Sequence, residues 1–224
     1  MVLKTRLVTR DRLVEAAMEL FYVQGYEATS VAEVLDKAAV NSGSLYYYFT
    51  GKEELLLAVL DRYKEMLWPA VIEPVFKRES DPIERIFALL EAYGEGLSYT
   101  VFTGGCPIGN LAIEVGDHIA EARKKVAESF AGWCGWIEKC LEDAEERLPP
   151  SVDRKKLAQF VLTVMEGAVM QARAHGSIAP FDASVAQLRA YFNLLLAQGG
   201  EKNRKGKPQV HPSAPLRAGT DEHE

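Results

Sequence analysis

Apolar residues recur every three or four positions along most of the chain, and this period constrains the fold more than any other sequence feature. Such spacing places apolar side chains on one face of an α-helix, whereas a half-buried strand alternates apolar and polar residues. No run of strand-like alternation occurs in the sequence. The period therefore predicts an all-α fold of about nine helices.

Glycine and proline separate the periodic segments from one another. Gly25 and Gly51 each end an apolar stripe, and Pro69, Pro74 and Pro82 cluster in a break between two helical regions. Residues 199–224 lose nearly all large apolar side chains, so they are expected to form a disordered tail. The expected helices cover residues 9–24, 31–38, 42–49, 52–66, 82–98, 107–115, 117–147, 153–175 and 182–197.

Composition excludes several classes of protein. With 224 residues, of which 48% are hydrophobic, the chain can bury a sizeable core, and three cysteines give neither a disulfide framework nor a zinc-binding spacing. No signal peptide opens the chain, and no apolar run approaches the ~18 residues that span a bilayer. We therefore expect a cytoplasmic protein without a membrane partner, a metal or a cofactor. The net charge of −6 argues against a wholly basic nucleic-acid binder but allows a small DNA-reading surface.

Residues 29–55 have the organisation of a helix-turn-helix. An apolar helix, a tight corner at residues 39–41 and a second helix of about two turns follow one another. Asn41 is placed to cap the second helix, and Ser42, Gly43 and Ser44 leave its first turn open to close approach. Helices that enter the major groove read bases with their N-terminal residues, so residues 42–49 are the candidate recognition helix.

A set of residues between positions 21 and 55 forms a recognisable pattern: Phe21, Gly25, Tyr26, Thr29, Ser30, Val31, Gly43, Ser44, Leu45, Tyr46, Phe49, Lys52, Glu53 and Leu55. Through these residues, positions 7–60 resemble the tetracycline-repressor (TetR) family of bacterial transcription regulators. The GCPIGNLAIE stretch at residues 105–114 looks like the ligand-domain signature of one subgroup. The resemblance implies a two-part chain, with a DNA-binding domain over residues 1–50 and an effector-binding and dimerisation domain over residues 51–198.

This resemblance implies roles for individual residues. It implies phosphate contacts from Thr29, Tyr47, Tyr48 and Lys52, and it implies contacts to base edges or thymine methyl groups from Ser42, Gly43 and Tyr46. Leu45 and Phe49 are expected in the core. Ala39 stands where many members have glycine, and Ser42 where many have lysine, so both positions bear on base preference. Residues 1–10 hold three cations and no acid, and are expected to reach the DNA as an N-terminal arm.

The last two expected helices carry long apolar stripes. The family resemblance implies that they pack against the same pair from a second subunit as a four-helix bundle, and the alternative is an ordinary intrachain core. A two-fold homodimer would match a palindromic operator on double-stranded DNA, with half-sites about one helical turn, or a multiple of it, apart. The effector itself is expected to be a largely hydrophobic small molecule that releases the DNA.

Candidate effector contacts are aromatic, sulfur-containing or acidic residues between the expected helices. Glu166 lies in the apolar run VLTVMEGAVM, where an ionised side chain is costly unless it is paired or exposed. It could meet a cation on a ligand, but pairing with Arg173 or with a cation of a partner subunit is the favoured alternative. For the aromatic residues the alternative is plain core packing. The candidates are Trp68, Tyr93, Phe102, Cys106, Trp133, Glu166 and Met170.

Cys106 follows two glycines and precedes Pro107, which suits the start of a short helix. A helix N-terminus lowers the pKa of a thiol, so Cys106 is a candidate sensor of oxidants or electrophiles. The alternative is a buried small hydrophobic residue, which is the commoner state of a free cysteine. Cys134 and Cys140 lie within the long periodic helix and are expected in the core.

Two other function classes compete with a DNA-binding repressor. One is a thiol-dependent enzyme that uses Cys106 with His118, and the other is a protein-binding module whose helix-turn-helix no longer binds DNA. The chain has no GxSxG, HExxH or phosphate-loop motif, which argues against the enzyme. The intact tyrosines of residues 46–48, together with Lys52, argue against the loss of DNA binding.

Overall fold

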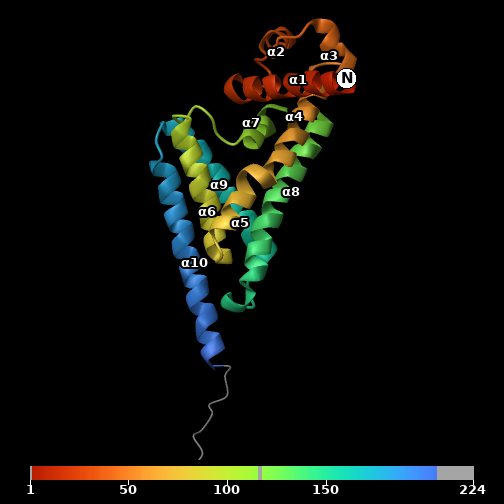
Figure 1. The fold of residues 1–224 in the computed structure, drawn as a ribbon. Helices are drawn as coiled ribbons and strands as arrows, with labels where there is room; N and C mark the ends of the chain where they lie inside the picture. Colours follow the sequence, from red (N-terminus) through yellow and green to blue (C-terminus); the bar gives the residue numbers. More distant parts are fainter. Residues whose placement is uncertain (1, 116–117, 206–224) are drawn as a thin grey trace, which may run out of the picture.

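The computed structural model describes the backbone of residues 2–115 and 118–205, and in these residues every regular element is a helix, as the sequence predicts (Figure 1). A head of three helices caps one end of an elongated helical bundle. The head consists of α1 (Val2–Gln24), α2 (Val31–Ala38) and α3 (Ser42–Tyr48). The remaining helices are α4 (Lys52–Leu67), the π-helical turn η1 (Trp68–Ile72), α5 (Glu73–Arg78), α6 (Pro82–Tyr99), α7 (Pro107–Val115), α8 (Ala120–Asp143), the 3-10 turn η2 (Glu145–Arg147), α9 (Arg154–His175) and α10 (Ala179–Lys205).

The head has its own apolar core. Leu13, Ala17, Val34 and Leu45 are fully buried where α1, α2 and α3 meet, and Phe21 packs edge-on against Tyr26 at the end of α1. These residues come from the apolar stripes that the helical period predicts. Their burial fixes the angle at which α3 is held, and it leaves the opposite face of α3 on the surface.

Two sets of hydrogen bonds hold the corner between α2 and α3. Asn41 accepts a 2.9 Å hydrogen bond from the backbone N–H of Ser44, so it caps α3 as expected. Arg12 reaches across from α1 and donates to the carbonyl oxygens of Ala38 and Ala39. Ala39 itself has a φ of 51°, in the left-handed region that glycine adopts without strain. This backbone conformation explains why glycine suits that position.

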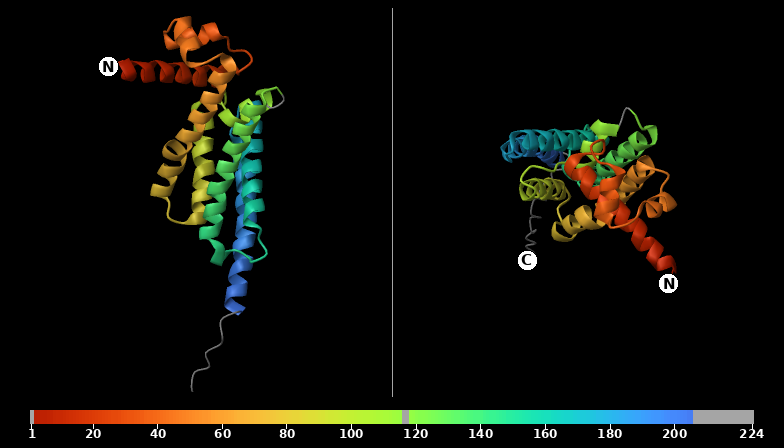
Figure 2. Two further views of the ribbon diagram at one scale, coloured as in Figure 1. Left: turned by 90° about the vertical axis from the view of Figure 1, so that its right-hand side faces the viewer. Right: turned by 90° about the horizontal axis from the view of Figure 1, so that it is seen from above.

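The second part of the molecule is a bundle in which α9 packs against both α8 and α10. Helix α4 leaves the head and runs down beside α8, while α6 lies against α8, α9 and α10 (Figures 1 and 2). Short α7 lies directly beneath the head, between the head and the upper ends of the long helices. This position places α7 in contact with both parts of the chain.

The prolines do not break the helical path in the way that the sequence predicts. The chain stays helical from Lys52 to Arg78, with Pro69 inside η1 and Pro74 in the first turn of α5. Proline lacks an N–H, but the first turn of a helix needs none, and a π-helical turn relaxes the register of the hydrogen bonds. Helix α5 was therefore missed, and only residues 79–81 separate it from α6.

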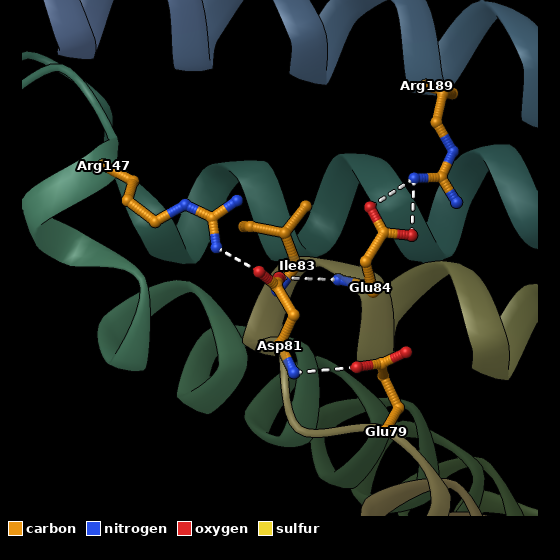
Figure 3. A network of polar contacts seen from close by, with 6 residues as sticks. All are labelled: Glu79, Asp81, Ile83, Glu84, Arg147 and Arg189. Atoms are coloured by element: carbon orange, nitrogen blue, oxygen red, sulfur yellow. Dashed lines mark hydrogen bonds and ion pairs between the residues drawn. The ribbon is translucent and has the colours of Figure 1, made fainter.

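A polar network ties the start of α6 to the far end of the bundle (Figure 3). Asp81 accepts hydrogen bonds from the backbone of Ile83 and Glu84, and its other oxygen pairs with Arg147. Glu84 holds Arg189 of α10 at 2.6 Å. The guanidinium of Arg189 also lies 3.6 Å from the centroid of the Phe87 ring. The network therefore joins α6 to η2 and α10.

Both ends of the chain differ from expectation. The backbone of residues 2–10 belongs to α1, so the expected N-terminal arm is an extension of this helix, and its contact with DNA stays a prediction. Helix α10 continues to Lys205, so residues 199–205 are helical and the expected tail over residues 199–224 is corrected in that part. Gly199 explains the extension, because a Cβ there would lie 2.1 Å from the carbonyl oxygen of Arg147 and its absence lets α10 pack closely on η2. Residues 206–224 lie outside the described chain.

Candidate DNA-reading surface and effector cavities

Helix α3 presents its polar and aromatic residues on the outer surface of the head. Ser42, Gly43, Tyr46 and Tyr47 are exposed, and the two tyrosine side chains keep 63% and 60% of their accessible surface. Leu45 and Phe49 on the inner face are buried, as predicted. Tyr48 is half-buried, and its ring meets that of Tyr47 edge-on at 4.9 Å. The exposed face thus combines small residues at the start of α3 with phenolic groups one turn later.

Cations flank this face. Lys52 is the first residue of α4, and its ammonium lies 4.1 Å from the centroid of the Tyr26 ring and 3.4 Å from the carbonyl oxygen of Glu27. On the other side, the guanidinium of Arg10 lies over the ring of Phe49 at the end of α3. The sequence does not place Arg10 on this face, because residues 1–10 are expected to form an arm. The helical α1 instead holds it beside α3.

Thr29 does not have the geometry expected of it. Its side chain is 1% exposed, and its hydroxyl donates a 2.6 Å hydrogen bond to the carbonyl oxygen of Gly25. Because that hydroxyl is buried in the turn between α1 and α2, the expected phosphate contact from the Thr29 side chain is corrected. The exposed neighbour Ser30 caps α2 in a capping box with Glu33.

Two cavities flank the loop that leads into α7. The first, here named the α6 cavity, has a volume of about 560 Å³ and lies between α1, η1, α5 and α6. The second, the α9 cavity, has a volume of about 500 Å³ and lies between α7, α8 and α9. Gly105 lines both of them, so this loop separates one cavity from the other. The principal side chains of the α6 cavity are Tyr22, Val71, Val75, Arg78, Tyr93, Leu97 and Tyr99, and those of the α9 cavity are Cys106, Asn110, Ile113, Phe130, Leu162, Glu166, Met170 and Arg173.

Four of the seven predicted effector residues line these cavities and three do not. Tyr93 lines the α6 cavity, and Cys106, Glu166 and Met170 line the α9 cavity. Trp68 instead stacks on Trp136, with ring centroids 4.4 Å apart, on the surface of the bundle. Trp133 is a buried core residue, and Phe102 packs against the core from the loop before α7. Trp133 and Phe102 therefore follow the alternative of core packing, whereas Trp68 is exposed and neither lines a described cavity nor belongs to the core.

The environment of Cys106 contradicts a low thiol pKa. The thiol is 2% exposed, and its Sγ accepts hydrogen bonds from the N–H of Gly109 and the hydroxyl of Tyr93. Burial and the negative charge of Glu166 together raise the pKa of Cys106 to about 12, and the two hydrogen bonds lower it by less. The thiol sensor is therefore corrected to a buried, protonated cysteine that caps α7.

The enzymatic alternative also lacks its geometry. Cys106 precedes the first residue of α7, whereas His118 follows the last, so the nine-residue helix lies between them. At about 1.5 Å of rise per residue this separation exceeds hydrogen-bond reach several times over. His118 is also exposed, on the far side of α7 from the buried thiol. A Cys106–His118 dyad is therefore excluded.

Glu166 is not paired as expected. Arg173 donates to Asn110 Oδ1 at 3.0 Å, and the Oε1 atom of Glu166 is buried without any hydrogen-bond partner among the described residues. Burial raises the pKa of Glu166, and its hydrogen bond with Cys106 lowers it by less. The expected ion pair between Glu166 and Arg173 is therefore wrong, because Arg173 binds Asn110 instead.

Helix α7 joins these cavities to the head, which the sequence alone did not suggest. Near its start, the Tyr22 hydroxyl of α1 accepts from the N–H of Gly105 at 3.2 Å and lies 3.3 Å from its carbonyl oxygen. In its last turn, Glu114 accepts from the backbone N–H groups of Tyr26 and Glu27 at 2.6 and 3.1 Å. The glycines before α7 are the feature of the sequence that could indicate this close contact, because a Cβ at Gly104 would lie 1.9 Å from the Tyr22 hydroxyl.

Comparison with known proteins agrees with this arrangement. Residues 13–59 match the model of the bacterial regulatory proteins of the tetR family, and residues 82–188 match the tetracyclin repressor-like C-terminal domain. A protein of Mycobacterium tuberculosis, described as an uncharacterized HTH-type transcriptional regulator, is 30% identical over 202 residues, which are 87% of this chain and 98% of that protein. The chain belongs to the TetR family of transcriptional regulators.

Other relatives and solved structures extend this result. The HTH-type transcriptional repressor ComR of Escherichia coli is 26% identical over 181 residues, covering 78% of this chain and 84% of ComR. The reduced form of Escherichia coli NemR superposes with a TM-score of 0.72 at 26% identity, covering 81% of this chain and 96% of NemR. A regulatory protein TetR from Rhodobacter sphaeroides shares the fold with a TM-score of 0.74 at 24% identity, over 80% of this chain and 96% of that one.

Within the described part of the chain, this TetR-family regulator has no group of His, Cys, Asp and Glu side chains that could hold a metal ion. None of the helices described is long and apolar enough to cross a membrane.

Proposed function

We propose that this TetR-family regulator is a homodimeric repressor that binds a palindromic operator and releases it when a small molecule enters the ligand domain. The observation that carries the proposal is the position of α7. Its first turn forms the wall of both cavities, and its last turn holds the backbone of the head through Glu114. A ligand that displaces α7 must therefore strain or move the head.

The exposed face of α3 supports DNA binding. The small residues Ser42 and Gly43 open the first turn to a base edge, and the hydroxyls of Tyr46 and Tyr47 stand one turn further along. Phosphate contacts from Tyr47, Tyr48, Lys52 and Arg10 would fix the register of the head, while Ser42, Gly43 and Tyr46 would read sequence. Asn41 and Ser44 would contribute by holding the first turn of α3 in place.

An uncharged face on the last two helices supports the dimer. Phe160 and Met170 on α9 are 47% and 59% exposed, and Tyr191 and Leu194 on α10 are 43% and 62% exposed. Exposed alanines at positions 183, 190 and 197 continue the same face of α10 at seven-residue intervals. The rings of Phe160 and Tyr191 meet edge-on with centroids 6.0 Å apart, so the exposed apolar residues of the two helices adjoin there. Exposed large apolar side chains on two adjacent helices are typical of a subunit interface.

Repression rather than activation is supported by relatives. ComR of Escherichia coli and DhaR of a Mycobacterium species, which is 25% identical over 183 residues, are both named transcriptional repressors. Release by a ligand follows from linkage, because a ligand that binds the DNA-free state better than the bound state must weaken DNA binding by the same factor.

Gel retardation with DNA from around the protein's own promoter tests the proposal. We expect a complex with one dimer per site, whose affinity falls steeply with salt. Sedimentation of the free protein should give a dimer, and substitution of Leu194 by Glu should convert it to monomer and abolish the complex. A wild-type protein that sediments as a monomer, or that retards promoter DNA no better than unrelated DNA, would contradict the proposal.

A further inference from the structure

The α9 cavity contains a carboxylate whose hydrogen-bonding capacity is not satisfied. Glu166 projects from the middle of α9 into this cavity, and its Oε1 atom is buried with no partner among the described residues. Leaving a buried polar atom unpaired costs free energy, and the cost is greater when the group carries charge. The unpaired oxygen does not stabilise the fold by itself, which indicates that another molecule supplies the missing hydrogen-bond donor.

The surrounding residues make room for this carboxylate. Its other oxygen lies over Gly109 in the first turn of α7, where a Cβ would stand only 2.5 Å away. Cys106, the residue that precedes α7, hydrogen-bonds to Glu166. The close approach at Gly109 means that the first turn of α7 and the carboxylate cannot move independently. A ligand that moves the carboxylate of Glu166 therefore also moves the first turn of α7.

No cation of α9 neutralises Glu166. Arg173 is two helical turns further along the same helix, about 10 Å away, and it donates to Asn110 at the exposed rim of the cavity. The cavity of about 500 Å³ is otherwise walled largely by apolar side chains, among them Phe130, Leu162 and Met170. Glu166 is the only acid among the lining residues, while the lining cation Arg173 is engaged by Asn110. A buried acid within a largely apolar wall is an arrangement that orients a ligand with one polar end.

We propose that the α9 cavity takes an organic amine, with its protonated nitrogen on Glu166 and its apolar body along α8 and α9. This inference rests on the ligand-responsive function proposed above and names the chemical class of the ligand. A protonated amine supplies both the missing donor and the compensating charge, and charge-assisted hydrogen bonds are about twice as strong as neutral ones. A carboxylate ligand would instead meet Glu166 as a like charge.

Three probes with the same phenylbutyl body separate charge from shape: 4-phenylbutylamine, 4-phenylbutan-1-ol and 4-phenylbutanoate. Calorimetric titration of the dimer at neutral pH should give at least about tenfold tighter binding for the amine than for the alcohol, and weaker binding still for the carboxylate. In Glu166→Gln the amine should lose this preference, while the alcohol keeps its affinity. Glu142→Gln, which removes an exposed carboxylate far along α8, should retain the wild-type order.

The proposal is overturned if the amine shows no binding at millimolar concentration, binds no better than the alcohol, or keeps its preference in Glu166→Gln. It is also overturned if Glu166→Gln dissociates the dimer in sedimentation, because the carboxylate would then pair with a cation of the partner subunit. Operator retardation without ligand is measured separately on each variant. Failure of all variants to bind DNA contradicts the proposed function, whereas the calorimetric order of the probes tests the amine site alone.

Discussion

Glu114 in the last turn of α7 accepts a 2.6 Å hydrogen bond from the backbone N–H of Tyr26, which lies in the turn between α1 and α2. A second bond, from Glu27 at 3.1 Å, reaches the same carboxylate oxygen. Gly25 permits the approach, since a Cβ there would lie 2.6 Å from the other oxygen. A side chain of the C-terminal domain thus holds the main chain of the helix-turn-helix head.

Glu114→Ala should therefore loosen the head and weaken its coupling to the cavities. Hydrogen bonds to a charged group contribute about 1.5–3 kcal/mol each, so we expect the loss of both to lower the free energy of unfolding by about 3 kcal/mol or more. Denaturant titration measures this loss, and hydrogen exchange should show it at the amides of residues 26 and 27. Glu121→Ala, at an exposed position in the first turn of α8, is the control. Unchanged exchange at those two amides would contradict the assignment.

The Glu114 contact and the cavities also show what sequence can and cannot predict. The helical period predicts α2, α3 and α4 closely because each is amphipathic and begins after a capping residue or a glycine, namely Ser30, Asn41 and Gly51. It missed α5 because proline usually ends a helix, and only the π-helical turn at Pro69 lets the path continue. It could not exclude a reactive Cys106, because the thiol pKa is raised first by burial and then by the charge of Glu166, which is sixty positions further along the chain. Pairings of this kind depend on tertiary packing, which local periodicity does not encode.

Cys106 should be the least reactive of the three cysteines. Burial and the nearby Glu166 raise the pKa of the thiol to about 12, so the thiolate is scarce at neutral pH. Cys134 is only half-buried and its thiol pKa is raised mainly by that partial burial, so it should alkylate first. Iodoacetamide labelling followed by peptide mass spectrometry gives the order. Labelling of Cys106 before Cys134 in the folded protein would contradict the buried, protonated state.

Lys52 should contribute to DNA affinity without affecting sequence preference. Because a phosphate contact releases a counterion, Lys52→Ala should weaken binding to all sites and reduce the salt slope by about one. Tyr46→Ala should instead change the ranking of operator variants, since base-edge contacts supply about 1–3 kcal/mol of discrimination. Lys139→Ala on the distant end of α8 is the control. Retardation assays across a salt series on several operators measure both quantities, and an unaltered slope for Lys52→Ala would refute the docking.

Ala39→Gly should stabilise the head. Ala39 has a φ of 51°, and the left-handed region costs a residue with a Cβ about 1 kcal/mol, which glycine avoids. The greater freedom of glycine in the unfolded chain offsets part of this gain, so we expect a net increase of up to about 1 kcal/mol in the free energy of unfolding. Ala131→Gly, at an exposed position within α8, should lower it by about 1 kcal/mol. Denaturant titration compares the two, and destabilisation by Ala39→Gly would be contrary evidence.

The stability that Asp81 contributes should depend on pH. Partial burial of Asp81 opposes ionisation, but hydrogen bonds from the backbone of Glu84, from Arg147 and from the backbone of Ile83 together lower its pKa below the ordinary value. A carboxyl whose pKa is lower in the folded state stabilises the fold above its unfolded pKa of about 4. That contribution is lost as the pH falls from about 4 through the folded-state pKa, because protonation then occurs in both states.

Asp81→Asn separates this charge from the cap. Asparagine still caps α6 by accepting from Ile83, but it cannot form the ion pair with Arg147. We expect the wild-type protein to be the more stable of the two at pH 6, with the difference closing as the pH falls below about 4. When Arg147→Gln is also present, Asp81→Asn should change the free energy of unfolding at pH 6 by less, because the cation that Asp81 faces is gone. Denaturant titrations from pH 6 to pH 3 measure the difference, and a gap that widens toward low pH would mean that Asp81 is not ionised in the folded protein.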